Sequence, residues 1–325
     1  MREKKIHMLG STYSKFGAIK IGITQGELSG IGPEIIAKSL KALNSDKTIE
    51  LYVIAVKKGI NKIKANLRTP LGKHIHFIEP DIKSIPKKMR KSDVLICIYH
   101  AAQMALRKEL NAIVTAPIDK KKVAEKYAGF SGHTGFLKEI LRAKSVLMLM
   151  SAPKLKIGIM TEHVPLKDVV KCVTREKIIR AVKLFNHYLS KNKPKPCIGL
   201  LALNPHAGDS GLVGKEEQKI ISPTIKYLRT KRINVIGPIP ADSAFLPHIK
   251  NKCDGILAMY HDQGMIPAKI KGYDRLVNIT LGLPIIRTSP AHGVAYDLVG
   301  KNTASANSMI RAINQAAEMA LLERL

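Results

Sequence analysis

The sequence has no tryptophan, and aromatic residues make up only 5% of its 325 residues, so its core must be built mainly from aliphatic side chains and methionine. It also lacks any run approaching the roughly 20 apolar residues that span a bilayer. The N-terminus is basic, but it has no continuous apolar segment of the kind found in a signal peptide. These absences predict a cytoplasmic protein with no membrane partner.

Acidic residues are scarce, with 25 Asp and Glu against 54 Lys and Arg, which gives a formal net charge of +29. Such a charge could indicate nucleic-acid binding. However, the bases are spread along the whole chain, without a basic tail, a zinc finger, an RNA-recognition motif or a series of stacking aromatics. A lysine-rich solvated surface is the simpler interpretation, and nucleic-acid binding is the alternative from another functional class. A positive field would also speed the encounter with anionic substrates.

Several catalytic and metal-binding motifs are missing. The four cysteines include no C-x-x-C pair, which argues against a disulfide framework, a zinc ribbon and an iron–sulfur site. Each is expected to be a small buried hydrophobic residue. There is no G-x-G-x-x-G, Walker, Gly-x-Ser-x-Gly or cysteine-nucleophile motif, so nothing supports hydrolysis through a covalent intermediate.

Short apolar runs alternate with longer amphipathic segments, which is typical of an α/β fold with a largely parallel sheet. The expected strands cover residues 19–23, 51–56, 94–98, 112–115, 146–150, 156–160, 198–203, 256–259 and 277–280, with another near Val235. The expected helices cover residues 31–43, 101–110, 175–189, 215–228 and 304–322.

Two polar, glycine-containing segments lie next to these apolar runs. Residues 26–34 place three glycines directly after the first strand, where backbone could approach a ligand closely, although an ordinary tight turn would look the same. His133 and Thr134 open an apolar helical stretch, where a phosphate could dock. A simple helix cap at Thr134 is the alternative.

Three histidines, His163, His206 and His261, each follow an apolar strand. Ligands gather at the carboxyl ends of strands in such folds, and three imidazoles with an open position suit a divalent metal. Asp209, Asp242 and Asp262 lie nearby in the sequence and are candidates for orienting the imidazoles, or for simple loop capping.

Three further polar residues, Lys269, Asn278 and Arg287, interrupt apolar, turn-rich sequence near the C-terminus. Charged donors suit a carboxylate or phosphate, at about 1.5–3 kcal/mol per charged hydrogen bond. Lys269 could equally be one more surface lysine. Arg287 is harder to explain as a surface residue because it follows an apolar segment.

Taken in order, these segments resemble the 4-hydroxythreonine-4-phosphate dehydrogenase family from about residue 18 to the C-terminus. The segments that carry the resemblance are residues 26–34, 114–117, 132–134, 161–166, 203–209, 237–242, 258–264, 277–284 and 287–289. Each is modestly specific alone, but the ordered set is very specific.

The resemblance implies an enzyme of vitamin B6 (pyridoxal or pyridoxine phosphate) biosynthesis. Such an enzyme oxidises the C3 hydroxyl of 4-phosphooxy-L-threonine with NAD or NADP, and the resulting 2-amino-3-oxo-4-phosphooxybutanoate decarboxylates to 3-amino-2-oxopropyl phosphate. It implies a divalent metal (zinc, magnesium or cobalt) on His163, His206 and His261, and a homodimer in which His261 comes from the neighbouring subunit. Substrate would contact His133, Thr134, Lys269, Asn278 and Arg287. Residues that bind the cofactor are not assigned.

The family's fold is similar to isocitrate and isopropylmalate dehydrogenases, with two α/β/α lobes and a cleft between them. By that analogy, residues 18–135 and 290–325 form one lobe, residues 136–289 form the other with most of the ligands, and residues 1–17 are an N-terminal extension.

This chain departs from the family pattern at a few positions. Leu28 and Ser29 stand where the family usually has Pro and Ala, and Ala291 and Val294 stand where it usually has Asp and Thr. Related enzymes act on threonate or erythronate phosphate or on cyclic dihydrodiols. The set Lys269, Asn278 and Arg287 favours a phosphorylated substrate over a dihydrodiol.

Overall fold

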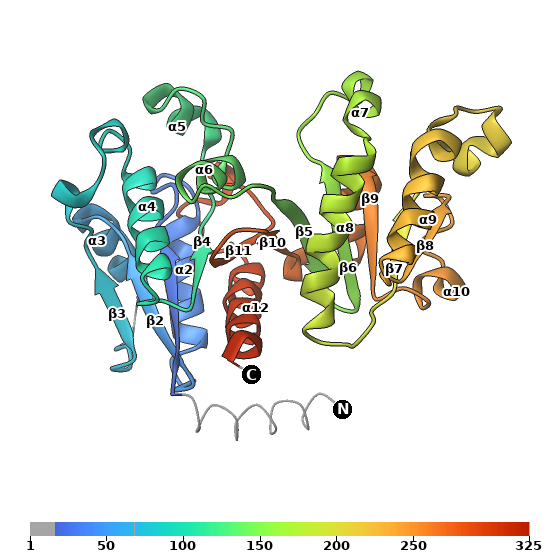
Figure 1. The fold of residues 1–325 in the computed structure, drawn as a ribbon. Coiled ribbons are helices and arrows are strands. Elements are labelled where there is room, and N and C mark those ends of the chain that lie inside the picture. Colours follow the sequence, from blue (N-terminus) through green and yellow to red (C-terminus); the bar gives the residue numbers. More distant parts are fainter. Residues whose placement is uncertain (1–16, 68, 325) are drawn as a thin grey trace. The chain divides into compact units, whose positions relative to one another are not determined.

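The computed structural model describes residues 17–67 and 69–324, which divide into two compact units (Figure 1). Of these residues, unit 1 contains those up to Ala143 and those from Leu283 onward, and unit 2 contains Lys144–Gly282. The sequence prediction put the two crossings near residues 135 and 290. The structure instead assigns the helix that begins at His133 and the strand that contains Arg287 wholly to unit 1. The predicted extension 1–17 lies, apart from Gly17, outside the described residues.

Unit 1 is built on parallel strands in the order β3-β2-β1-β4-β11. Their bounds are β1 Ile19–Thr24, β2 Ile49–Ile54, β3 Ile75–Ile78, β4 Ala112–Thr115 and β11 Ile286–Pro290. Strands β1, β4 and β11 are almost wholly buried, and β1 and β4 are correspondingly rich in apolar residues.

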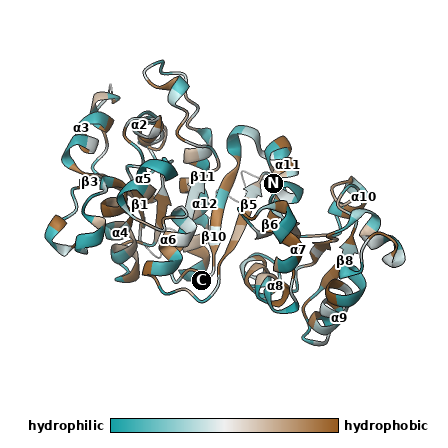
Figure 2. Cartoon of the chain, turned by 90° about the horizontal axis from the view of Figure 1, so that it is seen from above, coloured by the Kyte–Doolittle hydropathy of each residue, from teal (hydrophilic) through white to brown (hydrophobic). Residues whose placement is uncertain are grey.

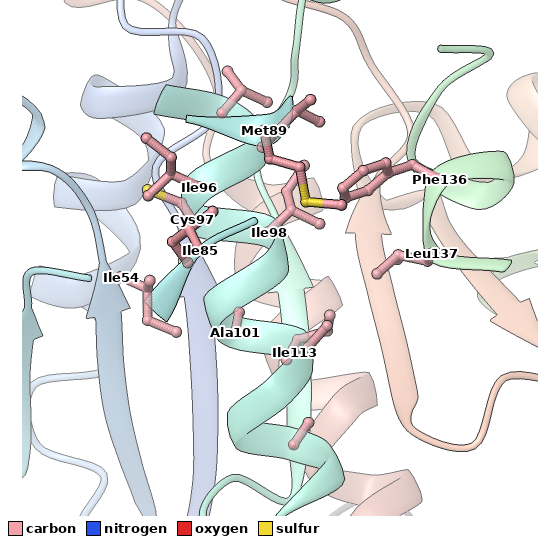
Figure 3. Close-up of a cluster of buried hydrophobic side chains, with 14 of the residues drawn as sticks. Ile54, Ile85, Met89, Ile96, Cys97, Ile98, Ala101, Ile113, Phe136 and Leu137 are labelled. Carbon is pink, nitrogen blue, oxygen red and sulfur yellow. The ribbon is translucent and has the colours of Figure 1, made fainter. Parts of the chain in front are cut away.

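The helices of unit 1 flank this sheet. Their bounds are α2 Gly32–Ala42, α3 Lys57–Ala65, α4 Asp93–Leu106, α5 Lys120–Lys126, α6 His133–Ile140 and α12 Asn307–Arg324, with 3-10 turns η1 Ile82–Ser84, η2 Lys87–Met89 and η6 Tyr296–Leu298. Helix α4 packs on the face of β4 that carries Ile113, in the cluster of Figure 3. Thr288, which follows Arg287 on β11, donates to the backbone oxygen of Ala312 in α12 (2.8 Å). Arg287 pairs with Ile113 in the β11–β4 register and shares its face, so Thr288 lies on the opposite face. Helices α4 and α12 therefore cover opposite faces of the sheet.

The expected strand at residues 94–98 is wrong, because this segment is the first half of α4. Ser92 caps the helix by accepting from Leu95 N (3.4 Å). Residues 94–98 are all apolar because this part of α4 packs both on the strands and toward helix α6. Figure 3 shows Ile96 and Ile98 of α4 in the same cluster as Phe136 of α6. A short apolar run of this kind does not distinguish a buried strand from a buried helix.

Unit 2 has strands in the order β10-β5-β6-β9-β7-β8. Their bounds are β5 Leu147–Ala152, β6 Leu155–Thr161, β7 Ile198–Leu201, β8 Val235–Ile239, β9 Gly255–Tyr260 and β10 Val277–Leu281. The pairs β10–β5 and β5–β6 are antiparallel, whereas β6–β9, β9–β7 and β7–β8 are parallel. The three parallel pairs therefore bring the carboxyl ends of β6, β9 and β7 to one edge.

The helices of unit 2 are α7 Leu166–Cys172, α8 Arg175–Ser190, α9 Ser222–Thr230, α10 Pro247–Lys250 and α11 His261–Gly272, with shorter turns η3 Pro205–Gly211, η4 Glu217–Ile221 and η5 Tyr273–Arg275. In both units the strands are mostly hydrophobic and the helices carry hydrophilic outer surfaces (Figure 2). The predicted mixed α/β class is confirmed. No helix among residues 17–67 and 69–324 is long and apolar enough to cross a membrane.

Candidate functional site

The three predicted histidines of unit 2 all follow the carboxyl ends of neighbouring parallel strands. His261 comes directly after β9, His163 lies two residues after β6, and His206 follows β7. The rings of His163 and His261 lie with their centroids 5.6 Å apart at an angle of 40°. The strand order β6-β9-β7 therefore brings to one edge of the sheet three imidazoles that are far apart in the sequence.

The loop that carries His206 is held by a buried carboxylate. Residues 206–210 all have positive φ, and His206 itself has φ 50° and ψ 28°. Glu217, only 2% exposed, accepts from Leu203 N and Asn204 N (both 2.8 Å) and from Asn204 Nδ2 (2.9 Å). Backbone in the left-handed region costs energy for a non-glycine residue, so these hydrogen bonds help to keep the loop in place.

Gln263 ties two of the strand ends together. Its side-chain oxygen accepts from Met259 N on β9 (2.9 Å), and its nitrogen donates to Ala202 O just after β7 (2.7 Å). Thr161 Oγ1 at the end of β6 donates to the Met259 backbone oxygen (2.7 Å). Gln263 and Glu217 thus hold the backbone next to His261 and His206, and the sequence analysis did not single them out. They give no periodic signal in the sequence, because their roles depend on contacts with other segments.

The candidate aspartates differ in their positions. Asp262 Oδ1 lies 2.7 Å from His261 Nδ1, the arrangement that orients an imidazole whose other nitrogen binds a metal. Asp209 is exposed on the left-handed turn, and Asp242 is exposed after β8. Within the described part of this single chain, no three His, Cys, Asp or Glu side chains form a group that could hold a metal ion. The metal site therefore stays a prediction.

Replacing Glu217 by glutamine should loosen the His206 loop. The substitution puts an amide donor against the Asn204 amide donor, and an unsatisfied buried group costs about 1–3 kcal/mol of unfolding free energy. Denaturant unfolding should show this loss, while Glu216→Gln, the same change at a less buried neighbour that also accepts from Asn204 (2.7 Å), should cost less. Equal stability of the two variants would contradict the role given to Glu217.

Unit 1 contains a buried cation next to a predicted substrate residue. Arg287 on β11 is 2% exposed, and its Nε and Nη2 donate to Thr115 Oγ1 at the end of β4 (3.1 and 2.6 Å). His133 is the first residue of α6 and follows Gly132, whose φ is 123°. Lys120, at the start of α5, packs against Gly132, since a Cβ placed there would lie 3.2 Å from Lys120 Cε. Lys120 was not singled out from the sequence.

Burial lowers the pKa of His133 well below its usual range, and the nearby cations Arg287 and Lys120 lower it further. The imidazole is therefore neutral at physiological pH. Its Nε2 is buried and has no hydrogen-bond partner within the described residues. A neutral imidazole with a free nitrogen, between two cations, is suited to contact an anionic ligand that supplies the missing partner.

The remaining predicted substrate residues lie on separate elements. Thr134 is half-buried on α6 in unit 1. In unit 2, Lys269 is exposed on α11, and Asn278 on β10 has a buried side-chain oxygen without a partner within the described residues. The structure thus places His133 and Arg287 close together in one unit, whereas Lys269 and Asn278 belong to the other.

The glycine-rich loop of unit 1 borders a cavity of about 650 Å³, the size range of small-molecule sites. Gln25, Gly26 and Leu28 line it. Gly26 has φ 68°, and a Cβ there would lie 2.5 Å from Pro117 O, so only glycine fits. Gln25 is fully buried and accepts from Val56 N (3.0 Å).

Two of the departures from the family pattern meet at this loop. Ser29 donates from its hydroxyl to Glu27 (2.6 Å) and accepts from Lys122 Nζ (2.8 Å). Val294 contributes the backbone oxygen that accepts from Ile31 N (3.0 Å). The serine therefore adds a tie between the loop and α5, and the valine's contact is made by its backbone.

The structure has an α/β fold, with three histidines that follow strand ends in unit 2 and the buried cation of Arg287 in unit 1. The sequence model of the family described as "Pyridoxal phosphate biosynthetic protein PdxA" matches residues 33–316. The chain belongs to this family, as the sequence resemblance predicted.

Individual proteins agree with this assignment. A 4-hydroxythreonine-4-phosphate dehydrogenase from Sulfurihydrogenibium sp. (strain YO3AOP1) is 39% identical over 317 residues, covering 92% of this chain and 97% of the relative. The crystal structure of the Klebsiella pneumoniae 4-hydroxythreonine-4-phosphate dehydrogenase has a TM-score of 0.79 at 30% identity, covering 93% of this chain and all of that one. Isocitrate dehydrogenase from Methylococcus capsulatus shares the fold alone, with a TM-score of 0.53 at 12% identity over 94% of this chain and 88% of that one. The expectation of a dehydrogenase is confirmed at the level of the family.

Proposed function

We propose that this protein oxidises 4-phosphooxy-L-threonine at its C3 hydroxyl with NAD or NADP, and that the 2-amino-3-oxo-4-phosphooxybutanoate formed decarboxylates to 3-amino-2-oxopropyl phosphate. A divalent metal would be held by His163, His206 and His261. The observation that carries most of this proposal is the arrival of these three imidazoles at the ends of adjacent parallel strands.

The chain's own residues would bind and orient the substrate. Arg287, fixed on Thr115, and Lys120 offer positive charge to an anionic group, and the neutral His133 offers a hydrogen bond. Lys269 and Asn278 are the other residues proposed to contact the substrate. When bound, the metal supplies positive charge beside the reacting oxygen, and the nicotinamide accepts the hydride. Holding the substrate in one orientation is the protein's main contribution to the rate.

The metal donor set fits a borderline divalent cation such as zinc or cobalt, because imidazole nitrogen suits these metals. The Asp262 carboxylate against His261 would fix the tautomer that leaves Nε2 free to bind. Magnesium prefers oxygen ligands, and substrate oxygens would have to complete its coordination.

Threonate and erythronate phosphates are the alternative substrates, because the cationic residues fit any phosphorylated four-carbon acid. The test is kcat/KM of the purified protein for 4-phosphooxy-L-threonine, the two sugar-acid phosphates and a cyclic dihydrodiol. The highest value for 4-phosphooxy-L-threonine supports the proposal, and a higher value for a sugar-acid phosphate would replace the substrate while keeping the fold and metal. Turnover of the dihydrodiol alone would contradict the phosphate site.

We also propose that the enzyme is a homodimer in the cytoplasm. Helix α11 begins with His261 and exposes Ile266 (59%) and Ile270 (72%) one turn apart, and Tyr273 follows at 86% exposure. Large apolar side chains exposed together on one element are typical of an interface. A second copy covering this face would lie against the helix that carries a predicted metal ligand and Lys269.

A complementation experiment tests whether the metal site is shared between subunits. In a shared site, mixing inactive His163→Ala and His261→Ala chains should restore about one quarter of wild-type activity, because half of the randomly formed dimers carry one intact site. Mixing His163→Ala with His206→Ala should restore none, since both residues would come from the same chain. The ring centroids of His163 and His261 lie 5.6 Å apart within one chain, so the alternative is a metal site built within one chain. In that case neither mixture would recover activity, provided that subunit exchange is demonstrated.

Nucleic-acid binding is the competing explanation of the net charge of +29. We attribute this charge to a solvated lysine surface. Retention on DNA should then vanish at moderate salt, whereas specific binding would persist there.

A further inference from the structure

Cys197 and Cys253 lie far apart in the sequence, but the parallel pairing of β7 with β9 brings them to neighbouring strand starts. Cys197 immediately precedes β7 and Cys253 lies two residues before β9. Both side chains are half-buried, and both thiols are free. The sequence predicted that each cysteine is a small buried hydrophobic residue, which holds for Cys97, whereas Cys172, Cys197 and Cys253 are only half-buried.

The backbone around the two cysteines is tightly held. Ile198 pairs with Gly255 in the parallel β7–β9 register, Asp254 N donates to Cys197 O (2.8 Å), and Cys197 N donates to Asp254 Oδ2 (2.8 Å). Lys193 Nζ holds the same carboxylate at 2.9 and 3.0 Å. Neighbouring strands lie about 5 Å apart and residues rise about 3.3 Å. A cysteine diagonal to its partner is therefore about 6 Å away between Cα atoms, which falls in the disulfide range.

The Cys253 side chain is directed over β7. A Cβ placed on Gly199 would lie 2.7 Å from Cys253 Sγ, so the sulfur occupies the space that the glycine leaves open beside Cys197. The other two cysteines lie elsewhere, Cys97 on α4 in unit 1 and Cys172 at the end of α7. The geometry needed for a crosslink is thus specific to one pair.

We propose that Cys197 and Cys253 form a reversible intrachain disulfide that clamps β7 to β9 when the protein meets a low-molecular-weight disulfide such as oxidised glutathione. One protein thiolate attacks a sulfur of the small disulfide, forms a mixed disulfide and releases one small thiol. The second protein thiolate then attacks the protein-side sulfur and expels the second small thiol. Two protein thiols are oxidised, one small disulfide is reduced to two thiols, and the two protons move to the released thiolates.

The reaction should depend steeply on pH. Burial raises the pKa of Cys253 to about 11, and burial followed by the charge of Asp254 raises the pKa of Cys197. The thiolate is the nucleophile, so its fraction, and with it the initial rate, should rise about tenfold per pH unit between pH 7 and 8. At neutral pH the dithiol therefore reacts slowly. It stays reduced during a brief exposure to the oxidant and forms the disulfide only during a prolonged one.

The experiment incubates the full chain with oxidised glutathione, then measures intact mass, free thiols and disulfide-linked peptides. The expected product has lost about 2 Da, carries no glutathione, links the Cys197 and Cys253 peptides, and reverts with dithiothreitol. Free thiols should fall from four to two. Because the crosslink closes a long loop, the oxidised protein should melt about 5 °C or more above the reduced one.

Single variants supply the controls. Cys197→Ser should keep a glutathione adduct on Cys253, because no second thiol can resolve it, and Cys172→Ser should form the crosslink as wild type does. A stable glutathione adduct on the wild-type pair, or a crosslink whose rate depends on protein concentration, would overturn the proposal. An unchanged melting temperature in fully crosslinked protein would overturn the clamp.

Discussion

Replacing Arg287 by methionine should lower kcat/KM for 4-phosphooxy-L-threonine by about 10- to 150-fold, the equivalent of one charged hydrogen bond at about 1.5–3 kcal/mol. The guanidinium is buried and held by Thr115, so its charge has a fixed position that methionine cannot supply. Methionine has a similar length and flexibility but no charge, which limits the loss of packing. The measurement is steady-state NADH formation over a range of substrate concentrations.

The same variant has a second readout that does not depend on turnover. Because the cation of Arg287 lowers the pKa of His133, its removal should raise that pKa, although burial remains the larger cause of the shift. A pH titration of the His133 ring by NMR would detect this change. Arg311→Met, a matched change on the surface of α12, should leave both the titration and kcat/KM near wild type. An unchanged His133 titration in Arg287→Met would contradict the proximity of the two groups.

Replacing His206 by alanine should weaken metal binding by more than about 100-fold. Loss of a residue that only hydrogen-bonds to a metal ligand typically weakens binding by about 10- to 100-fold, and loss of a ligand itself should cost more. Turnover should fall in parallel, because charge stabilisation at the reacting oxygen would be lost. Metal content after dialysis and NADH formation are the two measurements. His206 is exposed, so removal of its side chain should have little effect on packing.

His248→Ala provides the matched control, since His248 is an exposed histidine on α10 of the same unit. It should keep wild-type metal content and turnover. Circular dichroism would establish that both variants are folded. Unchanged metal content in a folded His206→Ala protein would sink the three-histidine site.

Much of the fold could be predicted from the sequence, because buried parallel strands are continuous apolar runs of the right length. Strand β4 was predicted at its observed bounds, and β1, β6 and β10 within two residues. Helix α4 was misassigned in its first half because it is apolar on more than one side. Strand β11 was missed because Arg287 and two hydroxyl residues interrupt its apolar pattern, although all of it is buried.

The site was predictable where a residue follows a strand, and not where its role depends on another segment. His163, His206 and His261 could be chosen because each comes after an apolar run, and the parallel order β6-β9-β7 then groups those strand ends. The contacts of Gln263 and the proximity of Cys197 to Cys253 depend on which strands become neighbours, which the spacing in one sequence does not reveal. The resemblance to a known family assigned the substrate residues, and the structure adds the contact partners of Arg287 and His133.

The most direct test of the account is NADH formation by the purified, metal-free protein with 4-phosphooxy-L-threonine and NAD, before and after addition of zinc, cobalt or magnesium. We predict negligible NADH without metal and sustained formation with at least one of the three. No NADH with any metal and with either NAD or NADP, from protein that is folded and has bound the metal, would contradict the proposed reaction.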